Sequence, residues 1–276
     1  MYALVALGLT LQYGVARIMN LSYGEFLVAA ALAAYWLYTG LAVSPLVALI
    51  VAAPAAFALN WAIYRVLLMP LVRRAKSRDM LEVDSILATF GILFVVQGIA
   101  HVMVGGQYYS YSYLSIPLTI LGSTVALNRL IALLFAAAIG LALYAALTRT
   151  RAGTAIRAVA VDPVAAGLVA IDVRRASAFA FALGGALVAA GGVLVSVFLT
   201  FNASMGVVFT MKALIVVIMG GVGNLLGALL AGLVLGLAET AVARLVDPGL
   251  TLAANFTLFL LVLLWRPTGL FGSPPR

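Results

Sequence analysis

Long apolar runs separated by short polar breaks make up almost the whole chain. Because these runs exceed the roughly ten residues of a barrel strand and are apolar on every face, they predict membrane-spanning helices rather than strands. We therefore expect an all-α integral membrane protein, a polytopic helical bundle of about eight or nine transmembrane segments with broken or re-entrant helices. The runs lie at about residues 26–40, 43–64, 83–104, 127–147, 176–199, 211–219, 225–243 and 250–265.

Two runs are short for a crossing. The chain opens on apolar sequence from Met1 to Ala16, with no basic region before it and no small-residue cleavage site after it. We interpret this run as an abbreviated first helix, not as a signal peptide. The run at 211–219 spans a bilayer only if it begins near Met205. The expected organisation is a single transmembrane domain over residues 1–276.

The composition excludes most soluble classes of protein. Hydrophobic residues make up 66% of the chain, charged residues 9%, and the mean hydropathy is +1.21. A soluble domain cannot cover so much apolar surface, which excludes a soluble enzyme, a disordered tail and a nucleic-acid binder. The chain has no cysteine, so it forms neither a disulfide nor a thiolate metal site. Its net charge of +8 fits the basic cytoplasmic loops of a membrane protein.

Basic residues gather in two loops and indicate the orientation of the chain. Two crossings separate the loops, so both face one side, which the positive-inside rule identifies as the cytoplasm. Nine crossings then place the N-terminus outside and Arg276 inside, and leave Arg129, Lys212 and Arg244 outside. The first loop holds Arg65, Arg73, Arg74, Lys76 and Arg78, and the second holds Arg149, Arg151, Arg157, Arg174 and Arg175.

Motifs for catalysis and nucleotide binding are absent from the sequence. There is no Walker A run, and the glycine-rich stretch from Gly220 to Gly227 contains no lysine, so we expect no ATP bound by a P-loop. The only histidine, His101, has no cysteine or nearby carboxylate to complete a metal site. We expect a chain that is not an enzyme and holds no cofactor or metal of its own.

A polar break between the first two apolar runs is the first candidate for a functional site. It places Asn20, Tyr23, Gly24 and Glu25 between two helices. In one interpretation Glu25 lies in the first turn of the second helix, where the helix dipole favours an anion or where the carboxylate meets water. In the other, the break lines a translocation pathway, because non-helical backbone at membrane depth requires protein or a water-filled cavity beside it.

A second break, at Gly220, Gly221, Gly223 and Asn224, interrupts the apolar sequence near the other end of the chain. Its glycines allow close approach of backbones, and Gly223 and Gly227 form a G-x-x-x-G pair typical of packed membrane helices. We assign these four residues to the same pathway, with helix packing as the alternative.

Two further features leave alternatives open. Glu239 lies inside an apolar run, where a carboxylate is costly and therefore indicates a functional role. Alternatively, Glu239 lies close enough to the outer interface to contact water, with Arg244 as its neighbour. The loop at 105–117 carries four tyrosines within residues 108–113. These predict either an interfacial aromatic belt or a contact surface for an external partner.

The cytoplasmic segment 148–175 contains a short helix of its own. Asp162 and Pro163 suit the N-cap and first position of a helix that we expect to end near Val169. This helix is apolar, so it either binds a partner or rests on the lipid surface. We expect three small residues in it to let the helix enter a cleft: Ala165, Ala166 and Gly167.

Four motifs, in order along the chain, resemble those of LivH-type permeases, the permeases of branched-chain amino acid ABC importers. Residues 20–26, NLSYGEF, resemble the motif N-F-A-H-G-E-F, and residues 157–173, RAVAVDPVAAGLVAIDV, resemble R-A-x-A-x-D-P-x-A-A-x-x-x-G-I-D-V. Residues 220–224, GGVGN, and 266–272, RPTGLFG, resemble two further stretches of the family. Ser22 and Tyr23 replace Ala and His of the first motif, and Ala170 replaces a Gly of the second.

The resemblance implies a type II ABC-importer permease fold and a function in transport. Such a chain forms half of a pathway for branched-chain or other hydrophobic amino acids in the bacterial inner membrane, with its C-terminus in the cytoplasm. The implied partners are a second, LivM-like permease, two LivG/LivF-like ATPases that bind ATP, a periplasmic binding protein and membrane lipid, but no nucleic acid. The residues implied to couple the chain to the ATPases are Arg157, Asp162, Pro163, Ala165, Ala166, Gly167, Ile171 and Asp172.

Two other functions remain as alternatives. Glu25 and Glu239 would suit a secondary transporter of small polar solutes that is driven by an ion gradient. A membrane scaffold would show no flux of substrate at all.

Overall fold

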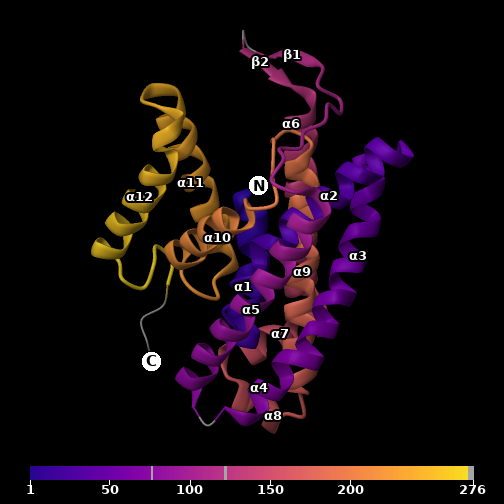
Figure 1. Cartoon of the computed structure of the whole chain (residues 1–276). Helices are drawn as coiled ribbons and strands as arrows, with labels where there is room; N and C mark the ends of the chain where they lie inside the picture. The colour runs from indigo at the N-terminus through magenta and orange to yellow at the C-terminus, as the bar shows by residue number, and fades with distance from the viewer. Residues whose placement is uncertain (76, 121–122, 273–276) are drawn as a thin grey trace.

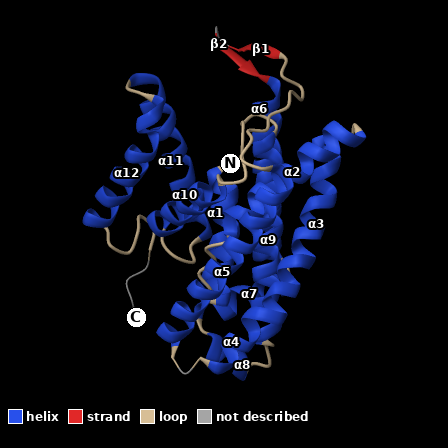
Figure 2. Cartoon of the chain, viewed as in Figure 1, coloured by secondary structure: helices blue, strands red, loops and turns tan. Residues whose placement is uncertain are grey.

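The computed structural model describes residues 1–75, 77–120 and 123–272, and these are helical apart from loops and one short hairpin (Figures 1 and 2). The elements are α1 (Tyr2–Ala16), α2 (Tyr23–Leu41), α3 (Pro45–Ile63), the π-helix η1 (Tyr64–Leu68), α4 (Met69–Arg74), α5 (Arg78–Val104), β1 (Pro117–Ile120), β2 (Ser123–Ala126), α6 (Leu127–Arg149), α7 (Arg151–Val161), α8 (Pro163–Leu168), α9 (Val173–Ser196), α10 (Gly206–Gly220), α11 (Leu225–Leu245), the 3-10 helix η2 (Pro248–Leu250) and α12 (Thr251–Trp265).

The helices follow the apolar runs and confirm a multi-pass helical membrane protein. Within the described residues, seven helical stretches are long and apolar enough to cross a bilayer. Two shorter apolar helices, α1 and α10, have 15 residues each. The sequence requires a crossing in this region to begin near Met205, and helix α10 begins at the next residue, Gly206. The total of nine crossings stays a prediction.

Helix α9 lies at the centre of the bundle and packs mainly against α3, α1 and α2 (Figure 1). Small residues on α9 make these contacts close. A Cβ on Gly192 would collide with the Leu27 carbonyl of α2, and one on Gly184 would lie 2.6 Å from the Gly8 carbonyl oxygen of α1. The glycines of α9 therefore allow neighbouring helices to pack closely around it.

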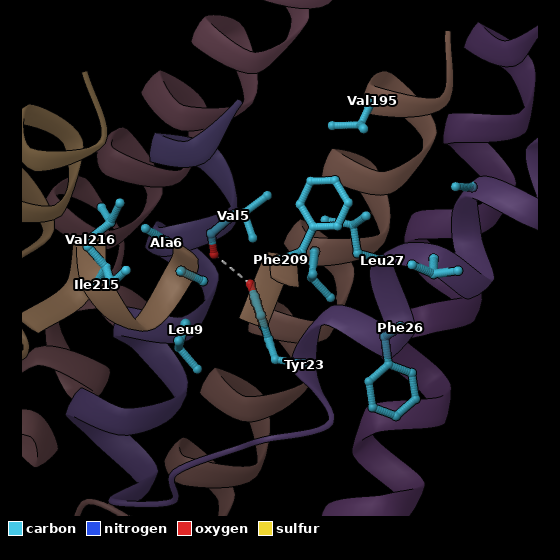
Figure 3. Packing of buried hydrophobic residues seen from close by; sticks show 14 of the residues in the cluster. Val5, Ala6, Leu9, Tyr23, Phe26, Leu27, Val195, Phe209, Ile215 and Val216 are labelled. Carbon is cyan, nitrogen blue, oxygen red and sulfur yellow. Dashed lines mark hydrogen bonds between the residues drawn. The ribbon is translucent and has the colours of Figure 1, made fainter. Parts of the chain in front are cut away.

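Helices α1 and α2 form the interface between two groups of helices. On one side lies α9 with α3, and on the other side α10, α11 and α12 pack on α1, α2 and one another (Figure 1). Apolar side chains from α1, α2, α9 and α10 meet here, with Leu9, Phe26, Leu27, Phe209 and Val216 among them (Figure 3). A change in this interface would alter the arrangement of both groups.

The two basic segments meet at one end of the bundle, as predicted. Helices α4, α7 and α8 lie together at that end, and the β1–β2 hairpin lies at the opposite end (Figure 2). The prediction that the arginines of these segments lie in loops is wrong, because η1 and α4 continue α3 as helix up to Arg74 and α9 begins at Val173. Arg65 of η1 and Arg73 of α4 line a cavity with Arg174 and Arg175 of α9. Lys76 and Arg276, which also belong to the topology prediction, lie outside the described residues.

The tyrosine-rich loop packs back onto the bundle, which neither sequence interpretation described. Tyr109 exchanges two backbone hydrogen bonds with Phe201, of 2.8 and 3.0 Å, and its ring lies 5.0 Å from that of Tyr35 in α2. The Tyr111 hydroxyl lies 2.8 Å from Ser196 Oγ in α9. The hairpin that follows, which pairs Pro117 with Ala126 and Leu118 with Val125, was not predicted.

We predict that Gly192→Ala destabilises the protein, because the new methyl group would displace α2 from α9 at a cost of roughly 1–3 kcal/mol. The matched control is Gly98→Ala in α5, where a Cβ meets nothing within 4 Å. The control should be neutral or should stabilise by about 0.5–1 kcal/mol. Thermal unfolding of the detergent-solubilised proteins measures both. Equal melting temperatures for the two variants would contradict the close packing of α9.

Candidate functional site

The break between α1 and α2 is non-helical backbone enclosed by side chains. Asn20 Nδ2 donates to Gln12 Oε1 at 2.9 Å, and Asn20 Oδ1 accepts from the Ser22 backbone N–H at 3.1 Å and from Ser22 Oγ at 2.6 Å. Gln12 in turn donates to the Phe181 carbonyl of α9 at 2.9 Å. A polar chain thus connects α1, the break and α9.

Two threonines bind further backbone groups in and beside the break. Thr89 Oγ1 of α5 accepts from the Leu21 N–H at 3.1 Å and donates to the Met19 carbonyl at 3.0 Å. Thr210 Oγ1 of α10 lies 2.8 Å from the Gly24 nitrogen and 3.3 Å from the Leu21 carbonyl oxygen. Unwound backbone away from water needs such partners, since each unsatisfied group costs several kcal/mol in lipid.

The break lies at the level of the middle of two long spans. Thr89 is near the midpoint of α5, and the Tyr23 hydroxyl reaches both Gly184, near the midpoint of α9, and Val5 of α1 (Figure 3). These two hydrogen bonds are 3.3 Å and 2.8 Å long. The bond geometry therefore supports a helix broken inside the membrane. Tyr23 itself is fully buried and connects helices, while its role in a pathway stays a prediction.

Glu25 lies in the first turn of α2, as predicted, and is 1% exposed. It does not meet water at a membrane edge, so that part of the first interpretation is wrong. Its carboxylate contacts Gly206, the first residue of α10, and Oε1 has no hydrogen-bond partner among the described residues. The first turns of two helices thus flank one carboxylate, and both helix dipoles favour a negative charge there.

The second break, Gly220 to Asn224, forms a sharp turn between α10 and α11. Gly221 and Gly223 have φ values of 97° and 80°, which side chains other than glycine rarely adopt. Asn224 caps α11 by accepting from the Gly227 N–H at 3.0 Å, and its Nδ2 donates to the Phe271 carbonyl at 2.8 Å. The C-terminal stretch 266–272 therefore binds this turn, a contact that sequence reasoning missed.

The structure separates the two groups of predicted pathway residues. Gly24 and Glu25 lie against the start of α10, and Asn20 and Tyr23 bond towards α1 and α9, whereas Gly220, Gly221, Gly223 and Asn224 lie at the end of α10. A helix of 15 residues places its ends about 20 Å apart. The two groups share α1, because Gly14 of α1 packs against Gly223.

Glu239 has a different partner from the one that its sequence neighbours suggested. Its Oε1 lies 2.7 Å from Lys212 Nζ of α10, and Lys212 also donates to the Tyr2 hydroxyl at 2.9 Å. Asn255 of α12 donates to Glu239 Oε2 at 3.2 Å. The ion-pair partner of Glu239 is therefore Lys212 and not its sequence neighbour Arg244. The outer position of Lys212 stays a prediction. Four helices meet at this mostly buried ion pair, which borders a cavity of about 590 Å³ that Arg244 also lines.

The segment 148–175 has the predicted start of a short helix. Asp162 Oδ1 accepts from the backbone N–H groups of Val164 and Ala165 at 2.8 and 3.0 Å, and Pro163 is the first residue of α8. The helix ends at Leu168, one residue before the predicted end. Asp172 then caps α9 through the Arg175 N–H at 3.1 Å, so both acidic residues of the motif start helices.

Most of this segment is exposed, but one predicted contact residue is not. Arg157, Ala165 and Gly167 are exposed, and Ile171 is half-buried. Ala166 is 3% exposed and packs in the chain's own apolar core, so the expectation that it enters a partner's cleft is wrong. An apolar surface remains, which we call the α8 patch; its members, each at least 70% exposed, are Val161, Val164, Leu168 and Val169.

The backbone conformation at Ala170 explains why the family motif has glycine at this position. Its φ is 61°, in the left-handed region, where a side chain other than glycine costs about 1–2 kcal/mol. The turn between α8 and α9 therefore favours the glycine that Ala170 replaces.

The long apolar helices and the helix broken inside the bundle define a polytopic membrane protein of the permease class. The chain belongs to the family of the branched-chain amino acid transport system permease component, whose model matches residues 1–265. The resemblance that the four motifs indicated is therefore confirmed.

Curated relatives match nearly the whole chain. It is 30% identical over 293 residues to the high-affinity branched-chain amino acid transport system permease protein LivH of Escherichia coli K12, covering 99% of this chain and 92% of that protein. Identity to BraD of Pseudomonas aeruginosa is 29% with the same coverage. A probable LivH of Methanocaldococcus jannaschii is 26% identical over 87% of this chain and 76% of its own length. No solved structure matches the chain.

We predict that Lys212→Met strongly destabilises the protein, because it leaves Glu239 as an unpaired buried charge at a cost of roughly 3–5 kcal/mol. The double variant Lys212→Met/Glu239→Gln should recover much of this loss in thermal unfolding. The control is Arg175→Gln, which breaks the exposed ion pair with Asp172 and should cost less than about 1 kcal/mol. A Lys212→Met variant as stable as the control would mean that the pair contributes nothing.

Proposed function

We propose that this chain is the permease subunit of an ABC importer and forms half of a translocation pathway for branched-chain or other hydrophobic amino acids. A second, LivM-like permease forms the other half. The family and the names of the relatives support the transport of branched-chain amino acids. The buried break at Asn20–Glu25, at the interface between two groups of helices, supports a position for the pathway beside α1, α2 and α10.

The observation that carries the proposal is the α8 patch. Four exposed apolar side chains on the basic, water-facing end of a membrane protein favour a protein partner. Because the sequence has no nucleotide motif, the energy for transport comes from outside the chain. Two LivG/LivF-like ATPases bind ATP and receive α8, so this chain is not an enzyme and needs no cofactor of its own.

The connection from α8 to the pathway is short. Helix α8 is followed by Ile171 and by Asp172, the cap of α9, and α9 accepts hydrogen bonds from Gln12 and Tyr23 beside the break. When the ATPases close on ATP, a displacement of α8 moves the start of α9. The movement then reaches the break through these carbonyl contacts, and access to the pathway changes sides.

The proposed location is the bacterial inner membrane, with α8 and the C-terminus in the cytoplasm. The hairpin end then faces the periplasm, where a substrate-binding protein delivers its ligand. The arginines around α4, α7 and the start of α9 support this orientation.

We predict that Leu168→Gln uncouples transport, because it puts an amide into the apolar contact with the ATPases. Uptake of leucine and the ATPase activity stimulated by binding protein, in proteoliposomes with all subunits, should fall by about tenfold or more for a loss of roughly 1.5 kcal/mol. The matched control is Leu245→Gln, an equally exposed leucine at the opposite end of the bundle. Uptake driven by an ion gradient without ATP would favour a secondary transporter, and no flux at all would favour a scaffold.

We predict that the α8 end is cytoplasmic. The chain has no cysteine, so single cysteines report their own exposure. A Gly167→Cys variant should react with an impermeant maleimide in inside-out vesicles and not in intact cells, since Gly167 is exposed and a Cβ there meets no atom within 4 Å. A Tyr108→Cys variant should behave in the opposite way. Labelling of the Gly167→Cys variant from outside would invert the topology.

A further inference from the structure

A cavity of about 440 Å³ lies at the basic end of the bundle, between η1, α4 and the start of α9. Four arginines line it: Arg65, Arg73, Arg174 and Arg175. The first two come from the end of the α3–η1–α4 helix, and the other two follow the turn after α8. The fold therefore brings together basic residues that are about 100 positions apart in the sequence.

Positive charge exceeds negative charge in the lining of this cavity, where four arginines face one carboxylate. Asp172, the acidic residue in its lining, already binds Arg175, with 3.0 Å between Asp172 Oδ2 and Arg175 Nε. Among the described residues, Arg65, Arg73 and Arg174 form no ion pair with a carboxylate. Three guanidinium groups around one cavity are suited to a phosphate group, which they bind through paired N–H donors.

A row of aromatic side chains adjoins one of the arginines of this cavity. The Arg65 guanidinium lies 5.7 Å from the centre of the Trp61 ring, one helical turn along α3 towards the membrane interior. Trp61 stacks on Phe57 at 6.1 Å, and Phe57 meets Phe179 of α9 at 5.4 Å. A row of aromatic rings between α3 and α9 thus begins where the arginines end.

We propose that this cavity binds an anionic phospholipid from the cytoplasmic leaflet. The lipid phosphate lies among Arg65, Arg73 and Arg174, and the acyl chains follow Trp61, Phe57 and Phe179. A basic pocket between helices on the cytoplasmic side is a suitable site for an anionic headgroup. A free phosphate or an acidic protein surface would use the arginines but not the aromatic row, which is why the lipid fits the whole site. The proposal does not depend on the transported substrate.

Quenching of Trp61 fluorescence by brominated lipids tests the site directly. The other two tryptophans are replaced in a Trp36→Phe/Trp265→Phe background, which leaves Trp61 as the reporter. The full-length protein in phosphatidylcholine nanodiscs is titrated with phosphatidylglycerol brominated on its acyl chains. Phosphatidylcholine brominated in the same way reports non-specific contact. We expect stronger quenching by phosphatidylglycerol at equal mole fraction.

Arg174→Gln and Arg73→Gln should each weaken the preference for phosphatidylglycerol about fivefold, because each arginine near an anionic headgroup contributes about 1 kcal/mol. Neither residue touches Trp61, so the reporter is unchanged. The matched control is Arg151→Gln, an exposed arginine of the same cytoplasmic end that does not line the cavity, and it should keep the preference. Equal melting temperatures confirm that the variants are folded.

Three results would overturn the proposal. Equal quenching by the two brominated lipids would mean that no selective site exists. Reversal of the quenching by excess inorganic phosphate or glycerol 3-phosphate would identify a site for a free phosphate. Unchanged quenching in Arg174→Gln together with loss of ATPase binding would identify the arginines as a protein docking surface. Selective quenching in an unchanged protein that shows no uptake driven by ATP would contradict the proposed function and leave the lipid site standing.

Discussion

The need to satisfy backbone polar groups away from water determines the centre of this structure. Between α1 and α2 the chain leaves the helical conformation at the level of the middle of its long spans. Side chains of Asn20, Thr89 and Thr210 form hydrogen bonds with backbone groups in and after the break, and Gln12 holds the Asn20 side chain in place. Because these side chains belong to α1, the break, α5 and α10, the same bonds that allow the unwound backbone also fix the helices around it.

Close packing by small residues connects this centre to the basic end of the bundle. Helix α9 carries glycines where it meets α1 and α2, so its backbone carbonyls at Phe181 and Gly184 lie within reach of Gln12 and Tyr23. The start of the same helix is capped by Asp172, which follows soon after the end of α8 in the chain. Protein packed at this density transmits displacement instead of absorbing it. Helix α9 therefore joins the segment that contains α8 to the buried break.

Local signals in the sequence predicted local structure well. Apolar runs gave the helices, and Asp162 with Pro163 gave the start of α8, because caps and spans depend on residues a few positions apart. The contacts that were missed join distant residues. Lys212 of α10 forms an ion pair with Glu239 of α11, and the Phe271 carbonyl accepts a hydrogen bond from Asn224. Ala166 is buried against α7 and α9 and is not exposed. No periodicity in the sequence encodes these pairings, since each depends on how complete helices pack.

The place of Glu25 follows from the division of the bundle. Helices α9 and α3 lie on one side of α1 and α2, and α10 to α12 lie on the other, so the break stands where the two groups meet. Glu25 projects from α2 onto the first residue of α10, across that boundary. Any separation of the two groups would expose this carboxylate to the space that opens, together with the free backbone groups at the start of α10. Oε1 of this buried carboxylate has no hydrogen-bond partner in the part of the chain that the structure describes, which is costly, and contact with water would reduce that cost. The chemistry of the break therefore suits a boundary that opens and closes better than one that stays closed.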